Sequence, residues 1–71
     1  MPEDRKLLAV LIDADNISAK YGEAIFDEIA SLGEASIRRI YGDFAGGGPQ
    51  GWNKDKLAAL AIVPHQQFAH T

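Results

Sequence analysis

The sequence contains no cysteine, which excludes disulfide bonds and thiolate zinc sites. No apolar run approaches the roughly 20 residues that a membrane-spanning helix requires. The first four residues, Met1 to Asp4, lack the basic start of a secretory signal. We therefore expect a soluble cytoplasmic protein.

An excess of positive charge is also missing. Seven Lys and Arg residues stand against ten Asp and Glu residues, which gives a formal net charge of -3. Stand-alone nucleic-acid binders usually carry a basic excess, because neutralised phosphates supply most of their non-specific affinity. The charge balance argues against tight nucleic-acid binding, unless the acids cluster around a cation that itself contacts phosphate.

The chain is short, with 71 residues. A chain near this length buries only about 60% of its unfolded surface, so its stability should be marginal. The hydrophobic content of 46% is typical of globular proteins and argues against disorder. These properties indicate one small domain or part of one.

The most informative stretch is LLAVLIDADN at residues 7–16, an apolar run that stops at two acids and an amide. Such a run predicts a strand buried on both faces inside a parallel sheet. In open α/β sheets, ligands bind beyond the carboxyl ends of the strands. Asp13 and Asp15 lie two residues apart and share one side of an extended chain, where they repel each other. A divalent cation with oxygen ligands, Mg²⁺ or Mn²⁺, is the expected partner.

The remaining sequence alternates between helix and strand patterns. We predict a helix over 18–32 that stops at Gly33, a strand over 35–41, a glycine-rich loop over 46–51, a helix over 52–60 and a strand over 61–68 interrupted by Pro64. This order predicts right-handed crossovers and a parallel sheet. The carboxyl ends of the first two strands then bring Asp13, Asp15 and Asp43 to one edge of the sheet.

Each polar residue at this edge also has a structural interpretation. One of Asp15, Asn16 and Ser18 is expected to cap the following helix, because all three residue types are preferred there. Asn16 alternatively orients Asp13 or a phosphate. Asp43 follows Gly42 and alternatively acts as a turn residue.

The basic and aromatic residues allow two interpretations as well. Trp52, Lys54 and Lys56 either stack on a base and contact phosphate, or form a helix with one aromatic core anchor and a solvated basic face. Arg38 and Arg39 point to opposite faces of their strand, so one should cover a helix and the other should be solvated.

The two histidines, His65 and His70, lack the spacing of a helical metal site. We expect both to be surface residues.

Three segments together resemble a known family: VLIDADNI at 10–17, RIYGDF at 39–44 and IVPHQQF at 62–68, with Trp52 between the last two. They are similar to the opening of an NYN domain, of the LabA-like branch of the PIN-like nuclease superfamily. The resemblance implies a three-layer Rossmann-like α/β/α sandwich with a parallel sheet, and metal-dependent cleavage of RNA. It implies that Asp13 is the leading metal-binding acid, with Asn16 and Asp43 as its neighbours.

Residues and resemblance together define the expected site. The predicted catalytic residues are Asp13 and Asp43. The predicted metal ligands are Asp13, Asp15 and Asp43. The groups predicted to contact single-stranded RNA are those of Asn16, Asp15, Trp52 and Lys54. The chemistry would be metal-assisted hydrolysis without a side-chain nucleophile.

One departure from the family is large. Its members continue past the equivalent of Thr71 into a Gly-Lys-Asn-x-x-Asp segment with further acids, so residues 1–71 are expected to form the N-terminal β-α-β-α-β part of a single domain. In the family the missing part also supplies the strand beside the first one. We therefore expect little nuclease activity from this chain alone, and an open apolar strand edge that favours a homodimer, strand exchange or aggregation.

Two other functions stay open. In a phosphatase of the haloacid dehalogenase type, Asp13 would be the nucleophile and Asp15 the acid and base, although Ile17 stands where that family expects Thr or Val. In a non-catalytic module, the open sheet edge would bind RNA or another protein.

Overall fold

The computed structural model describes residues 5–67. Strands β1 (Leu7–Asp13), β2 (Glu34–Gly42) and β3 (Val63–Gln66) form a parallel sheet in the order β1-β2-β3. Helices α1 (Gly22–Leu32) and α2 (Lys54–Ala59) connect the strands, preceded by the 3₁₀ helices η1 (Ala19–Tyr21) and η2 (Pro49–Gly51). The predicted parallel α/β fold is confirmed, and it agrees with part of a PIN-like, Rossmann-type architecture.

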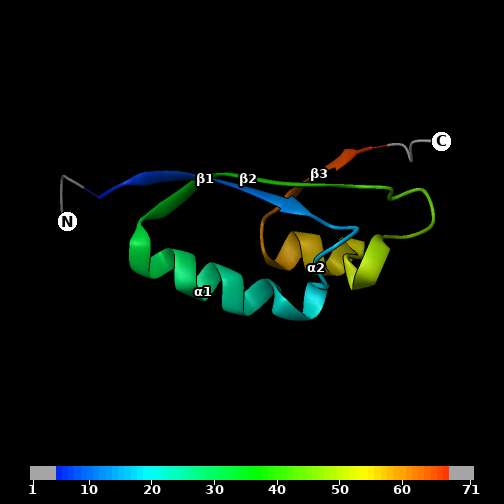
Figure 1. Cartoon of the computed structure of the whole chain (residues 1–71), viewed down its shortest axis with the longest axis horizontal. Coiled ribbons are helices and arrows are strands. Elements are labelled where there is room, and N and C mark those ends of the chain that lie inside the picture. The colour runs from blue at the N-terminus through cyan, green and yellow to red at the C-terminus, as the bar shows by residue number, and fades with distance from the viewer. Residues whose placement is uncertain (1–4, 68–71) are drawn as a thin grey trace.

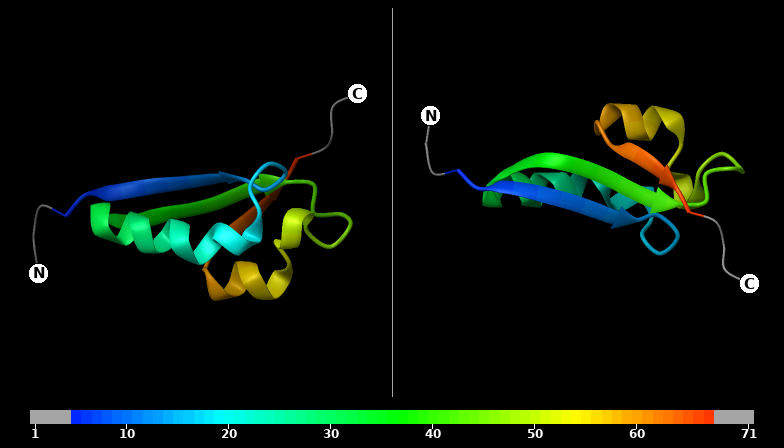
Figure 2. Two further views of the ribbon diagram at one scale, coloured as in Figure 1. Left: turned by 60° about the horizontal axis from the view of Figure 1, so that its bottom comes forward. Right: turned by 90° about the horizontal axis from the view of Figure 1, so that it is seen from above.

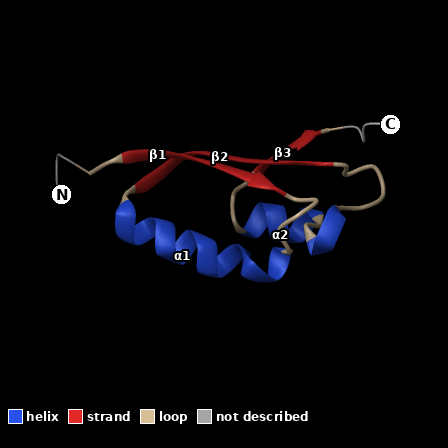
Figure 3. Cartoon of the chain, in the orientation of Figure 1, coloured by secondary structure: helices blue, strands red, loops and turns tan. Residues whose placement is uncertain are grey.

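Both helices cover the same face of the sheet (Figures 1 and 3), and the left view of Figure 2 shows this from another direction. Along β1 the exposure alternates: Val10 and Ile12 are buried, whereas Leu7 and Leu11 are 70% and 64% exposed. Successive side chains of a strand point to opposite faces, so the second face of the sheet is open among the described residues. The expectation that this strand is buried on both faces is therefore wrong for this part of the chain.

The core lies between the covered face and the helices. Ile40 of β2 and Trp52 have no exposed surface, and they pack with Val10, Ile12, Ala14, Ala19, Leu57 and Ile62. The indole N–H of Trp52 donates to the carbonyl of Ile17 at 2.6 Å. A Cβ at Gly22 would lie 2.7 Å from Leu60 Cδ1 and 3.2 Å from Trp52 Cη2. A glycine there lets the start of α1 approach the tryptophan closely.

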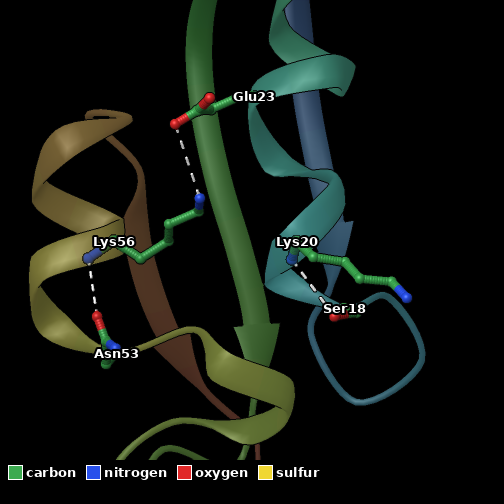
Figure 4. Close-up of polar contacts among 5 residues, drawn as sticks. All are labelled: Ser18, Lys20, Glu23, Asn53 and Lys56. Carbon is green, nitrogen blue, oxygen red and sulfur yellow. Dashed lines mark hydrogen bonds and ion pairs between the residues drawn. The ribbon is translucent and has the colours of Figure 1, made fainter.

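Side-chain caps begin η1 and α2 (Figure 4), whereas α1 continues from η1 without a side-chain cap of its own. The Ser18 hydroxyl accepts from the Lys20 backbone N–H at 3.3 Å, so Ser18 is the cap among the three predicted candidates, and the first turn is 3₁₀. Asn53 Oδ1 accepts from the Lys56 N–H at 2.9 Å, so α2 begins after Asn53 and later than predicted.

One ion pair joins the two helices. Lys56 Nζ lies 4.0 Å from a carboxylate oxygen of Glu23, whose side chain is 79% exposed. Such an exposed pair contributes little to stability.

The third strand is shorter than predicted, and Pro64 lies within it. Because β3 is an edge strand, its proline is tolerated. Phe68, the predicted end of this strand, lies outside the described residues.

The two arginines of β2 diverge as predicted. Arg38 donates to the Leu60 carbonyl at 2.6 Å, and its guanidinium carbon lies 4.2 Å from the Phe26 ring centroid. Arg39 is exposed. The first thus covers α1 and the end of α2, whereas the second faces solvent.

Over residues 5–67, no helix has the length and apolar character to span a membrane.

Candidate site at the carboxyl ends of the strands

Asp13 ends β1 and is exposed. Its Oδ1 accepts from the Asp15 backbone N–H at 3.1 Å, and its Oδ2 accepts from the Asn16 side-chain amide at 2.6 Å. The backbone N–H groups of Asn16 and Ile17 donate to the Asp13 carbonyl at 3.2 and 2.9 Å. The turn after β1 therefore holds this carboxylate in one orientation, and Asn16 makes the hydrogen bond to Asp13 that an orienting role requires.

Asp15 lies at the exposed tip of the same turn. Its carbonyl accepts from the Gln50 side-chain amide at 2.5 Å, which joins this turn to η2. A Cβ at Gly42 would lie 2.9 Å from Ala14 Cβ and 3.4 Å from Asp15 Oδ1. The end of β2 thus passes close beneath the turn because residue 42 has no side chain.

Asp43 follows β2, is exposed, and uses its carboxylate to shape the loop. Its Oδ1 accepts from the Ala45 N–H at 3.1 Å and from the Gln66 side-chain amide at 2.8 Å. Gln66 Oε1 accepts in turn from the Phe44 N–H at 2.9 Å. The hydrogen bond from Gln66 and the weaker one from Ala45 hold the pKa of Asp43 below its ordinary value. Asp43 therefore acts as a turn residue through Oδ1, which accepts both of these hydrogen bonds.

The register of the sheet places these groups in neighbouring strands: Asp13 pairs with Tyr41, two residues before Asp43. A hollow of about 360 Å³ at this edge is lined by Leu11, Ile12, Asp13, Tyr41 and Gln67. Within residues 5–67, however, no three acidic or histidine side chains converge closely enough to hold a metal ion. The described part of the chain thus offers Asp13 as a single oriented carboxylate rather than a cluster of three.

Two further residues predicted to contact RNA, Trp52 and Lys54, belong to the segment that leads into and begins α2 and not to a strand end. Trp52 has no exposed surface and packs in the core, so its ring is not available for stacking on a base. This corrects the base-stacking interpretation, because the buried indole is held by the Ile17 carbonyl. Lys54 is exposed at the start of α2, in agreement with a solvated basic face.

The structure adds three residues that the sequence analysis did not select: Tyr41, His65 and Gln66. The rings of Tyr41 and His65 stack, with centroids 5.1 Å apart and planes inclined by 26°. His65 is half-buried at the surface of the open face, because the Tyr41 ring covers part of it, so the expected surface position holds only in part. The sequence offered one signal for the Tyr41–His65 contact: the predicted pairing of parallel strands, which can place the two rings side by side. His70 lies outside the described residues.

Comparison with known proteins agrees with this architecture. The family model described as the NYN domain matches residues 7–71, nearly the whole chain. No curated protein and no solved structure matches. The family match indicates a nuclease-like, RNA-related function. A parallel sheet with a strand-end aspartate, together with this match, shows that the chain belongs to the NYN domain family.

Proposed function

We propose that this chain serves in metal-dependent hydrolysis of RNA phosphodiester bonds, with Asp13 as its central residue. The observation that carries the proposal is the position of Asp13: exposed, at the carboxyl end of β1, with each carboxylate oxygen held by a hydrogen bond from its own turn. Carboxylates at this place in an α/β sheet face the ligand crevice. The family match supports an RNA substrate. The segments at 10–17, 39–44 and 62–68 support the LabA-like branch of the family.

The donor atoms fit a hard divalent cation. Mg²⁺ prefers oxygen ligands, retains several waters, and is commonly held by one or two carboxylates together with substrate phosphate. Asp13 would be the direct ligand, since its oxygens are exposed and each accepts a single hydrogen bond from the described residues. Asp15 or the second oxygen of Asp43 would add one further contact, directly or through water, because no three acidic side chains converge among residues 5–67. The bound cation would polarise the phosphate and activate water for attack.

The protein groups have distinct tasks in this proposal. Asn16 keeps the Asp13 carboxylate from rotating, because its amide donates to Oδ2 at 2.6 Å. Gln50 holds the turn from the other side through the Asp15 carbonyl. Both are positioning residues, and neither needs to touch the phosphate.

The proposal is tested first by locating the cation. Paramagnetic Mn²⁺, titrated into the chain, should broaden the NMR amide signals of residues 13–16 more than any others. Asp13→Asn should abolish this pattern, because it removes the charged ligand. Asp55→Asn, which changes an exposed acid in the first turn of α2, is the matched control and should keep it. Broadening that centres elsewhere, or that survives Asp13→Asn, would contradict the proposal.

Activity is tested second. We expect this chain alone to cleave labelled single-stranded RNA at or near the background rate with Mn²⁺, because the described residues supply fewer than three clustered acids. If the chain cleaved RNA well above background and Asp13→Asn abolished this cleavage, the chain would need no further acids for activity. A trapped phosphoaspartate on Asp13 would instead indicate a phosphatase.

A non-catalytic binding module is the second candidate, and one observation favours it. The free side of β1 borders an apolar hollow of about 560 Å³, lined along its length by β1 and by Ile17, Ile25 and Ile29. RNA or protein binding that is unchanged by chelation of metal would support this function over hydrolysis.

A further inference from the structure

A row of three side chains crosses the carboxyl end of the sheet. Asp13 of β1 pairs with Tyr41 of β2, and Tyr41 pairs with His65 of β3. Their neighbour Ile40 is fully buried against the helices. Since side chains alternate along a strand, Asp13, Tyr41 and His65 lie on the opposite, open face.

The two rings of this row form a preorganised stack. Their centroids are 5.1 Å apart and their planes are inclined by 26°. Nε2 of His65 is enclosed and has no hydrogen-bond partner among residues 5–67. The histidine ring thus lies against the tyrosine ring with its Nε2 unpaired among these residues, and both residues are half-buried.

Space and charge beside the stack suit a nucleotide. The hollow of about 360 Å³ lies between Asp13, Tyr41 and Gln67, so a planar group there would lie next to the tyrosine. Arg39 precedes Tyr41 by two residues and so shares its face. It is exposed, and no carboxylate in the described part of the chain lies within ion-pair distance of it.

We propose that Tyr41 and His65 form a stacking platform for one base of single-stranded RNA, with Arg39 contacting a backbone phosphate of the same strand. This inference rests on the proposed function, because it places the base beside the phosphate that Asp13 serves. Aromatic platforms of this kind bind bases with little sequence preference, since every base has a π-face. A platform at this position would orient RNA across the strand ends even though the net charge of the chain is negative.

The first test uses the unmodified chain without metal. Adenosine monophosphate is titrated and compared with ribose 5-phosphate, which has the same phosphate and sugar but no base. We expect adenosine monophosphate to shift the ring protons of Tyr41 and His65, and ribose 5-phosphate to leave them in place. Equal shifts with both compounds, or no shifts at these rings, would overturn the platform.

The second test measures affinity for a short single-stranded RNA without metal. Tyr41→Leu should weaken binding roughly tenfold, the order expected for one stacked base, whereas Tyr41→Phe should retain it. Tyr21→Leu, which removes a tyrosine that is 52% exposed on η1, is the matched control and should bind as the original chain does. Circular dichroism establishes that each variant is folded, and unchanged affinity in folded Tyr41→Leu would refute the platform.

The two proposals fail separately. If the base shifts these rings but Mn²⁺ does not bind at Asp13, the platform holds and the hydrolytic function fails. If Mn²⁺ binds at Asp13 but adenosine monophosphate does not shift the ring protons of Tyr41 and His65, the hydrolytic function holds and the platform fails.

Discussion

Asp13 and Asp43 follow neighbouring strands and carry the same functional group, yet their surroundings differ. Asp13 is held by its own turn, through Asp15 and Asn16. Asp43 is held partly by Gln66, which is 23 residues away in sequence. The local contact was one of the alternatives that the sequence left open for Asn16, which is three residues from its partner. The distant contact depends on the pairing of β2 with β3, which brings Gln66 opposite Gly42.

Gln66→Ala should raise the pKa of Asp43 toward its ordinary value, because it removes the main hydrogen bond that favours the ionised carboxylate. A pKa lowered in the folded state means that ionised Asp43 contributes stability above its unfolded pKa, and that this contribution is lost as pH falls through the folded pKa. The acid-side loss of stability should therefore become shallower in the variant. Carbon-13 NMR titration of the Asp43 carboxyl measures the pKa. Gln67→Ala is the matched control, because residue 67 bonds to the Gly42 carbonyl through its backbone N–H, which the substitution keeps. This variant should leave the pKa of Asp43 unchanged. An identical Asp43 titration in both variants would contradict the role given to Gln66.

At the scale of the elements, Trp52 joins segments that are far apart in the chain. Its indole reaches the Ile17 carbonyl before η1, and its ring lies against Gly22 at the start of α1. The tryptophan thus fixes the loop before α2 to the loop after β1. The turn that carries Asp13 and Asp15 is therefore supported from the core side.

Trp52→Phe should destabilise the fold by about 1–3 kcal/mol, because it leaves the Ile17 carbonyl without its donor and removes part of the buried ring. Urea unfolding followed by circular dichroism measures the change. Tyr21→Phe also removes one polar atom from an aromatic side chain, but at an exposed position, so it should change the free energy of unfolding by less than about 0.5 kcal/mol. Equal stability of Trp52→Phe and the original chain would show that this hydrogen bond does not support the fold.

At the scale of the whole molecule, one side of the sheet is uncovered among the described residues, and both outer strands, β1 and β3, have a free edge. Leu7, Leu11, Ile37 and Val63 are between 44% and 70% exposed, and β1 pairs with β2 alone. Unpaired apolar strand edges readily pair with another chain. We propose that copies of this chain associate through β1.

Sedimentation velocity at increasing protein concentration should show this association. Leu11→Lys should reduce it, because Leu11 contributes both to the open face and to the hollow along β1. Ala58→Lys adds the same charge at an exposed position of α2 and should leave association unchanged. A monomer at every concentration, or equal effects of the two lysines, would argue against an interface at β1.

By itself, the sequence determined the order of strands and helices, the parallel sheet and the position of Asp13 at a strand end. These features depend on local patterns: apolar runs, caps, glycine stops and the geometry of parallel strands. Only the tertiary structure decided that Trp52 is a core residue, that Gln66 holds Asp43 and that Tyr41 stacks on His65. Each of these outcomes joins residues from different elements. The physical reason is that burial and cross-strand contact depend on which faces meet, which a pattern of single residues along the chain does not specify.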